Sequence, residues 1–346
     1  MARWNTLRKF YRYRRRMDGL AWHEKAHFVG NVLVGEAFGR SIPGFGQRLI
    51  EITLTHRCQC ACEHCYDATP ESHHSAGDLT TEEVVSVLKQ AREIGFTEVN
   101  FTGGEPLLRS DIVELVAAAR AIGLAPKINT NGVRLDRDMA RRLAEAGLSW
   151  GAVSIDSANP ATHDALRPQE GCFVDAVAGI RHLVDLGVPA SITTYARRDG
   201  IDGGLARIVA LGHELGVETV RILFPVPLGS YEDSVDQVLT REEKGRVREL
   251  LDDPIVTMES PREHSKCRAA ATKLNVAPDG TVTPCVFVPL GYGNIRQTPL
   301  KAIWDAIAEF DRMQKVEGHC PMCDPEFRER LALITEQPQG HTEAAG

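Results

Sequence analysis

The sequence of 346 residues contains no long apolar run and no excess of positive charge. Since a membrane-spanning helix needs about 18 or more apolar residues in succession, we expect no membrane span. The N-terminus lacks the apolar core and the small-residue cleavage site of a secretory signal peptide. The formal net charge of −7 argues against a nucleic-acid-binding protein, which usually carries a strong basic excess. The remaining composition, 43% hydrophobic and 25% charged, is ordinary for a globular protein.

Cysteine is the residue type that stands out. Most of the nine cysteines lie in spacings typical of metal sites, which favours a reducing cytoplasm over a disulfide framework. Cys58, Cys62 and Cys65 form a C-x3-C-x2-C run just after an apolar stretch. Three thiolates on one loop can bind three irons of a [4Fe–4S] cluster and leave the fourth iron open to another molecule. The alternative is a structural zinc site with His64 or a distant cysteine as fourth ligand.

Apolar strand-like runs and amphipathic helical stretches alternate from about residue 48. The runs are Leu49–Leu54, Val99–Phe101, Pro126–Asn129, Gly151–Ile155, Ala190–Thr194 and Val220–Phe224, and the helical stretches are 81–94, 111–122, 137–146, 173–186 and 203–215. Thr80 and Glu83 form a capping box at one helix start. Six β/α units predict a parallel α/β sheet with right-handed crossovers, either a full or partial barrel or an open doubly wound sheet.

The chain divides into four parts. Residues 1–47 are basic and rich in aromatics, and they predict either a helix packed on the barrel or a contact with a membrane surface or polyanion. Residues 48–235 form the α/β core. Residues 255–325 form a small cysteine-bearing domain, and the polar tail 336–346 is expected to be flexible.

The residues that suggest chemistry follow the predicted strands. The cysteine run follows the first strand, Thr102–Pro106 the second, and Asn129–Gly132 the third, while Ser154–Asp156 ends the fourth. Because active sites of β/α proteins form at the carboxyl ends of the strands, we expect these segments to meet. Two glycines let a backbone approach a ligand closely, and Glu105 beside them can accept a hydrogen bond from an ammonium group.

These motifs together resemble the radical S-adenosylmethionine (SAM) superfamily over residues 48–325. The resemblance implies a partial (β/α)6 barrel in which Cys58, Cys62 and Cys65 hold a [4Fe–4S] cluster and SAM binds its open iron. The remaining roles that it implies are these: Gly103, Gly104 and Glu105 hold the SAM amino group, His64 contacts adenine through its backbone, and Asn131, Ser154 and Asp156 approach the ribose or carboxylate. Arg167 pairs with the SAM carboxylate or forms a surface salt bridge.

A second cysteine set lies near the C-terminus. Cys267 is followed by twelve residues, Gly280, four residues and Cys285, and a C-x2-C pair follows at Cys320 and Cys323. Four cysteines can close a structural zinc site or a [4Fe–4S] cluster. In this context the set resembles the auxiliary-cluster domains called SPASM and Twitch. No cysteine follows Cys323, which favours the shorter Twitch type with one auxiliary [4Fe–4S] cluster.

The resemblance also implies the type of reaction. A flavodoxin- or ferredoxin-type donor supplies an electron to the cluster. The reduced cluster then cleaves SAM to a 5′-deoxyadenosyl radical, which abstracts hydrogen from an unactivated C–H bond. A second cluster offers an acceptor for the substrate's electron, so our first interpretation is oxidation of a sugar, an aminocyclitol or a similar small metabolite. A SAM-dependent dehydrogenase of an aminocyclitol has a similar layout.

Three alternatives stay open at this point. Cys172, just after the fourth strand's loop, is either the hydrogen donor of a radical SAM epimerase or a small buried residue that starts a helix. The second alternative is a peptide-modifying maturase, although the 47-residue extension is short for a peptide-recognition domain. The last alternative is a non-catalytic metal-binding protein. Cys60 lies outside the ligand spacing and is expected to be a spectator thiol.

Overall fold

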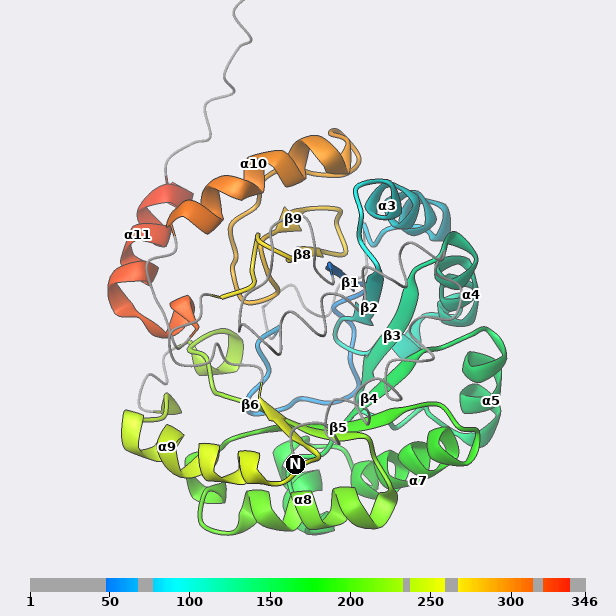
Figure 1. The fold of residues 1–346 in the computed structure, drawn as a ribbon, viewed down its shortest axis with the longest axis vertical. Coiled ribbons are helices and arrows are strands. Elements are labelled where there is room, and N and C mark those ends of the chain that lie inside the picture. The colour runs from blue at the N-terminus through cyan, green and yellow to red at the C-terminus, as the bar shows by residue number, and fades with distance from the viewer. Residues whose placement is uncertain (1–47, 68–76, 233–236, 259–266, 314–319, 337–346) are drawn as a thin grey trace, which may run out of the picture.

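The computed structural model describes residues 48–67, 77–232, 237–258, 267–313 and 320–336 (Figure 1). The basic segment 1–47 and the tail from residue 337 lie outside these residues. The strands are β1 Leu49–Thr53, β2 Glu98–Thr102, β3 Ala125–Thr130, β4 Trp150–Ser154, β5 Ala190–Tyr195, β6 Thr219–Leu223, β7 Val256–Met258, β8 Lys273–Val276 and β9 Val282–Thr283. The helices are α3 Thr81–Glu93, α4 Ile112–Ile122, α5 Arg137–Glu145, α6 Pro160–Leu166, α7 Cys172–Asp185, α8 Gly204–Leu215, α9 Arg241–Glu249, α10 Leu300–Met313 and α11 Pro325–Glu336.

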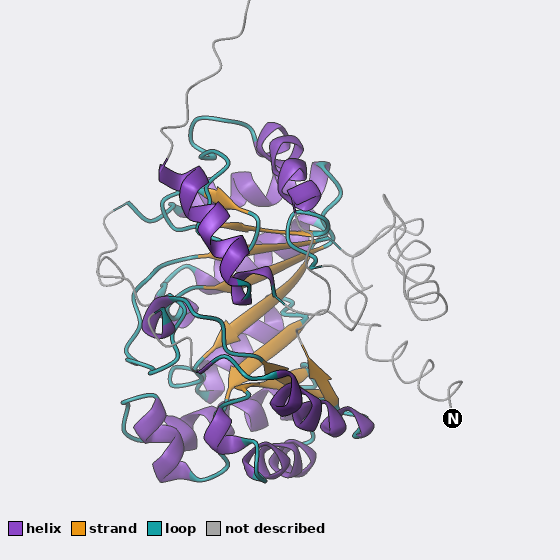
Figure 2. Ribbon diagram, turned by 90° about the vertical axis from the view of Figure 1, so that its left-hand side faces the viewer, coloured by secondary structure: helices purple, strands orange, loops and turns teal. Residues whose placement is uncertain are grey.

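The strands form one sheet in the order β7-β6-β5-β4-β3-β2-β1-β8-β9. All neighbours are parallel except β8 and β9. The helices lie outside this curved sheet (Figures 1 and 2). The six predicted strand runs coincide with β1 to β6, so the partial (β/α)6 barrel is confirmed.

The C-terminal segment is more closely joined to the barrel than the sequence predicted. Within the expected small domain 255–325, β7 pairs with β6 and β8 pairs with β1. Both strands are short, and their alternation of apolar and polar residues gives little signal in isolation. The barrel sheet therefore continues into the cysteine-bearing segment, which places the second cysteine set beside β1.

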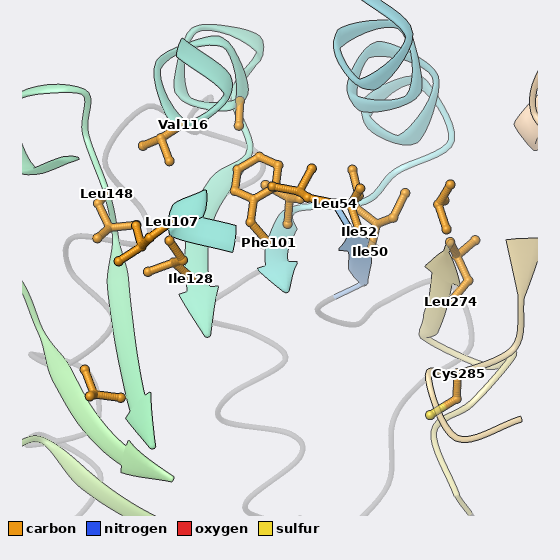
Figure 3. Close-up of a cluster of buried hydrophobic side chains, with 14 of the residues drawn as sticks. Ile50, Ile52, Leu54, Phe101, Leu107, Val116, Ile128, Leu148, Leu274 and Cys285 are labelled. Atoms are coloured by element: carbon orange, nitrogen blue, oxygen red, sulfur yellow. The ribbon is translucent and has the colours of Figure 1, made fainter. Parts of the chain in front are cut away.

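The hydrophobic core lies between the sheet and the surrounding helices. In β1, Ile50, Ile52 and Leu54 are at most 1% exposed and pack among the strands and helices (Figure 3). The intervening Glu51 and Thr53 are also buried, but they bond to residues of the neighbouring strand β8. Because side chains alternate between the two faces of a strand, the inner face of the barrel is polar.

The ends of the helices follow the sequence signals. The Thr80 hydroxyl accepts from the Glu83 N–H, and the Glu83 carboxylate accepts from the Thr80 N–H, which confirms the predicted capping box at α3. Positive φ angles occur at the glycine after each of five predicted helical stretches: Gly95, Gly123, Gly147, Gly187 and Gly216. These caps turn each helix back toward the next strand.

Candidate active site

A pocket opens at the carboxyl ends of the parallel strands. It encloses about 990 Å³, part of which is continuous with solvent. Its wall includes these residues predicted from the sequence: Cys58, Cys62, His64, Cys65, Gly103, Gly104, Asn131, Ser154 and Arg167. The expectation that the loops after the first four strands meet is therefore confirmed.

The loop after β1 brings the three cysteines of the C-x3-C-x2-C run to this pocket. A hydrogen bond from Cys60 lowers the pKa of Cys58, and another lowers the pKa of Cys62 to about 6. Burial raises the pKa of Cys65 to about 12. Since the thiolate is the form that binds metal, these hydrogen bonds favour the metal-binding form of Cys58 and Cys62.

The Gly103-Gly104 turn packs directly on the backbone that precedes Cys58. The Gly104 N–H donates to the Thr55 carbonyl at 2.8 Å, and the Glu105 N–H donates to the Arg57 carbonyl at 2.8 Å. A Cβ atom on Gly104 would lie 2.4 Å from the Arg57 carbonyl oxygen, which only a shift of the backbone would relieve. The glycines thus permit a close approach to the cysteine loop itself.

Glu105 lies beneath this turn and is not one of the pocket-lining residues. Its side chain is fully buried, and it accepts from the Leu107 N–H, the Thr130 hydroxyl and the Asn131 N–H at 2.8 to 2.9 Å. Burial raises the pKa of Glu105 to about 7, although these hydrogen bonds act in the opposite direction. The structure differs here from the expected contact with an amino group, because the carboxylate instead ties the turn after β2 to the end of β3.

Asn131 and Ser154 line the pocket as expected. The Asn131 side-chain amide lies 3.7 Å from the Cys58 sulfur, and its oxygen accepts from Gln59 at 3.1 Å. Both partners belong to the cysteine loop. Asn131 therefore helps to hold that loop against the end of β3.

Asp156, His64 and Arg167 form a buried cluster behind the cysteine loop. One Asp156 oxygen accepts from the Arg167 Nε and Nη2 atoms at 2.7 Å, and it lies 3.2 Å from the His64 Nε2 atom. Burial alone would raise the pKa of Asp156, but the charge of Arg167 and the contact with His64 hold it well below its ordinary value. Asp156 is not among the pocket-lining residues, and Arg167 forms a buried ion pair where a surface salt bridge was one expectation.

Cys172 begins α7 and is completely buried. Hydrogen bonds with Cys60 and His163 lower its pKa to about 5, and it is not one of the residues that line the pocket. This position corresponds to the alternative of a small buried residue at a helix start. Cys60, its hydrogen-bond partner, does line the pocket.

The second cysteine set also comes together in space. A hydrogen bond with Cys323, burial, and the nearby charges of Cys323, Cys267 and Cys285 all raise the pKa of Cys320. Burial raises the pKa of Cys285 to about 12. Over the residues that the structure describes, no three His, Cys, Asp or Glu side chains converge as ligands of a single metal ion would.

The segment after Cys285 joins the two cysteine sets. Val286 and Phe287 line the pocket that also contains Cys58, Cys62 and Cys65. The Phe287 ring packs edge-on against Tyr66, with 5.2 Å between the ring centroids. Since Tyr66 follows Cys65 directly, this contact brings the segment after Cys285 against the first cysteine loop.

Several residues that line the pocket are not predicted from the sequence, because they lie inside strands. Glu51 of β1 and Lys273 of β8 form a buried ion pair of 2.7 Å, and Arg221 of β6 donates to Thr193 at 3.3 Å. All four line the pocket. The alternation Leu-Ile-Glu-Ile-Thr in β1 was the available signal, since it places a carboxylate on the inner face of a barrel strand.

The comparisons with known proteins agree with this geometry. Residues 52–203 match the model of the Radical SAM superfamily, and residues 267–324 match the SPASM model, described as an iron–sulfur cluster-binding domain. The chain belongs to the radical SAM superfamily. As a radical SAM enzyme with a SPASM-type domain, it uses a [4Fe–4S] cluster, SAM and an auxiliary iron–sulfur cluster.

Other radical SAM proteins resemble the chain over most of its length. The AdoMet-dependent heme synthase of Nitratidesulfovibrio vulgaris is 28% identical over 312 residues, which is 80% of this chain and 84% of that protein. The PqqA peptide cyclase of Gluconobacter oxydans is 27% identical over 296 residues, with coverages of 80% and 82%. Streptococcus suis SuiB bound to S-adenosylmethionine shares the fold, with a TM-score of 0.67, 17% identity and coverages of 89% and 78%. In the described residues, no helix of this radical SAM enzyme combines the length and apolar composition needed to cross a bilayer.

Proposed function

We propose that this radical SAM enzyme oxidises a small hydroxylated metabolite, such as a sugar or an aminocyclitol. The observation that carries the proposal is the shared pocket wall. Cys58, Cys62 and Cys65 line the same pocket as Val286 and Phe287, which follow Cys285 directly. A substrate in this pocket would border both the first cysteine set and the segment that follows Cys285.

The thiols fit the two cofactors. We propose that Cys58, Cys62 and Cys65 hold the SAM-binding cluster, because three thiols line one pocket and Cys60 lowers the pKa of two of them. Cys267, Cys285, Cys320 and Cys323 would hold the auxiliary cluster within residues 255–325, because the other three are close enough to Cys320 to raise its pKa. When bound and reduced, the first cluster and SAM together supply a carbon radical that abstracts hydrogen from the substrate.

The protein binds and orients SAM through the turns after the strands. We propose that the backbone of Gly103 and Gly104 receives the amino group, and that Glu105 holds their turn in place from beneath. Asn131 and Ser154 face the pocket from the ends of β3 and β4, as ribose or carboxylate contacts require. The backbone beside His64 would contact adenine, as the family resemblance implies.

We propose a route past Phe287 for the second electron that the substrate loses. After hydrogen abstraction, oxidation requires loss of one electron and one proton. The electron would leave past Phe287 toward the auxiliary cluster that Cys285 and its partners would hold, which would serve as the one-electron acceptor, and the proton would pass to a pocket base or to solvent. The polar inner face, with the Glu51–Lys273 pair and Arg221, suits a hydroxylated substrate.

The first electron must come from another protein. We propose a flavodoxin- or ferredoxin-type donor and a cytoplasmic location, because the two cysteine sets need a reducing compartment.

The test uses anaerobically reconstituted enzyme with reductant, SAM and a panel of aminocyclitols and amino sugars. Wild type should form 5′-deoxyadenosine and a product with two hydrogens fewer than its substrate. The double variant Cys320→Ala, Cys323→Ala should retain 5′-deoxyadenosine formation and lose the oxidised product. Oxidised product from this double variant would show that the auxiliary cysteines are not the electron acceptor.

Modification of a peptide is a second candidate, favoured by the similarity to a PqqA peptide cyclase. The same assay separates the two functions when it is repeated with short synthetic peptides. Conversion of a peptide, with no turnover of the sugars and aminocyclitols, would replace the first proposal by the second.

A further inference from the structure

Arg167 is directed at a cysteine sulfur as well as at its acidic partner. The Arg167 Nη1 atom lies 3.7 Å from the Cys62 sulfur, while the Nε and Nη2 atoms both donate to Asp156 at 2.7 Å. The guanidinium group is a planar fork with donors in fixed directions. Pairing of one edge with Asp156 therefore determines where the remaining nitrogen points.

These contacts close a ring that returns to the cysteine loop. Asp156 lies 3.2 Å from the Nε2 atom of His64, which stands two residues after Cys62. The Glu63 N–H donates to the Leu166 carbonyl at 3.3 Å, so the backbone beside Arg167 is bonded to the backbone beside Cys62. The ring fixes the distance between the guanidinium group and the sulfur from both sides.

The ring is shielded from water. The side chains of Arg167, Asp156 and His64 are 8%, 0% and 3% exposed. A buried ion pair is retained at low cost only when its geometry is good and its remaining donors are used. The Cys62 sulfur supplies an acceptor for the donor that Asp156 leaves over.

We propose that Arg167, positioned by Asp156, raises the reduction potential of the SAM-binding cluster through its contact with the Cys62 sulfur. The inference depends on the proposed assignment of Cys62 as a ligand of that cluster. Hydrogen bonds to ligand sulfurs help to set the potentials of iron–sulfur clusters. An added electron makes the sulfur more negative, so a cationic donor stabilises the reduced form more than the oxidised form.

This role differs from the expected pairing of Arg167 with the SAM carboxylate. A carboxylate contact would affect SAM binding alone, whereas a sulfur contact acts on the cluster before SAM arrives. Measurement of the potential in the absence of SAM therefore distinguishes the two roles.

The experiment is a redox titration of the reconstituted full chain without SAM, followed by low-temperature electron paramagnetic resonance. Addition of SAM to a parallel sample identifies the SAM-binding cluster by the change in its spectrum. Arg167→Gln should reduce the equilibrium constant for reduction of this cluster about tenfold, which is about 59 mV for a one-electron couple. The signal of the auxiliary cluster should titrate as in wild type.

Arg197→Gln is the matched control. Arg197 pairs with Glu63 of the same loop at 3.2 Å, and its side chain donates to the carboxylates of Glu63 and Asp199. Its loss removes the same charge near the same loop, and it should leave the potential close to that of wild type. Equal shifts in both variants would assign the effect to net charge and overturn the sulfur contact.

Arg167→Lys covers the case in which the glutamine variant folds poorly. It retains the buried charge, but one ammonium group lacks the fork that spans Asp156 and Cys62. Its cluster potential should also fall, and an unchanged potential in the lysine variant overturns the proposal. Failure of wild type to bind any SAM-responsive cluster is a different result, because it refutes the proposed function and the inference with it.

Discussion

Glu105 provides a test of how the turn after β2 is held. Its side chain is fully buried, and its pKa is raised to about 7 from an ordinary value of 4.5. The folded protein therefore binds a proton at Glu105 more tightly than the unfolded chain does. The stability from this group is complete below pH 4.5 and is lost as the pH rises through about 7, and the full loss is on the order of 3 kcal/mol.

The perturbation is Glu105→Gln, which cannot ionise. The amide oxygen still accepts hydrogen bonds, but the NH2 group would stand where Oε2 accepts from the Asn131 N–H, so that two donors would face each other. This mismatch costs about 1–3 kcal/mol. At pH 5, wild type should therefore be the more stable protein. At pH 8 its advantage should have fallen by roughly 3 kcal/mol, to near zero or below.

The assay is urea unfolding of metal-free protein, under nitrogen with a thiol reductant, at several values between pH 5 and pH 8. The relevant quantity is the difference in unfolding free energy between wild type and variant at each pH. Glu83→Gln is the control, because the hydrogen bond from Arg296 lowers the pKa of Glu83 to about 2 and leaves it ionised throughout this range. If the difference in unfolding free energy between wild type and Glu105→Gln is as independent of pH as that between wild type and Glu83→Gln, then Glu105 does not titrate in this range and the prediction is wrong.

Three further predictions concern the pocket. Cys172→Ala should leave turnover largely intact and cost on the order of 1 kcal/mol of stability. Product formed in heavy water should have the same deuterium content with wild type and with the variant. Deuterium at a substrate carbon with wild type alone would instead indicate an epimerase. Gly104→Ala should prevent SAM cleavage and reduce the iron content, because its Cβ would lie 2.4 Å from the Arg57 carbonyl oxygen. The control is Gly245→Ala, which has open space around it and should keep the iron content of wild type. Phe287→Ala should retain 5′-deoxyadenosine formation but lower the yield of oxidised product per SAM cleaved, and an unchanged ratio would argue against electron transfer past this ring.

The barrel could be predicted from the sequence because its signals are local. The apolar runs match β1 to β6, and the capping box at Thr80 and the glycines after the helices are short-range patterns. The cysteine spacing and the Gly-Gly turn likewise depend on neighbours in the chain. Their meeting in one pocket followed from the parallel order of the strands.

The finer roles depend on contacts between distant residues, which local patterns do not specify. Glu105 was expected at a ligand, yet Thr130 and Asn131 take up its carboxylate from the next strand. Asp156 and Arg167 were expected at SAM; Arg167 does line the pocket, but the ion pair that it forms with Asp156, eleven residues away in the chain, was not predicted. The Glu51–Lys273 pair joins strands that are more than two hundred residues apart, so no sequence window contains it.

The most direct test of the central claim is iron and sulfide analysis of reconstituted protein, combined with electron paramagnetic resonance before and after addition of SAM. Wild type should contain roughly eight irons per chain. The double variant Cys320→Ala, Cys323→Ala should contain roughly four, and its remaining cluster should still respond to SAM. Four irons and a bound zinc in wild type, or loss of the SAM response in the double variant, would contradict the assignment of two separate clusters to the two cysteine sets.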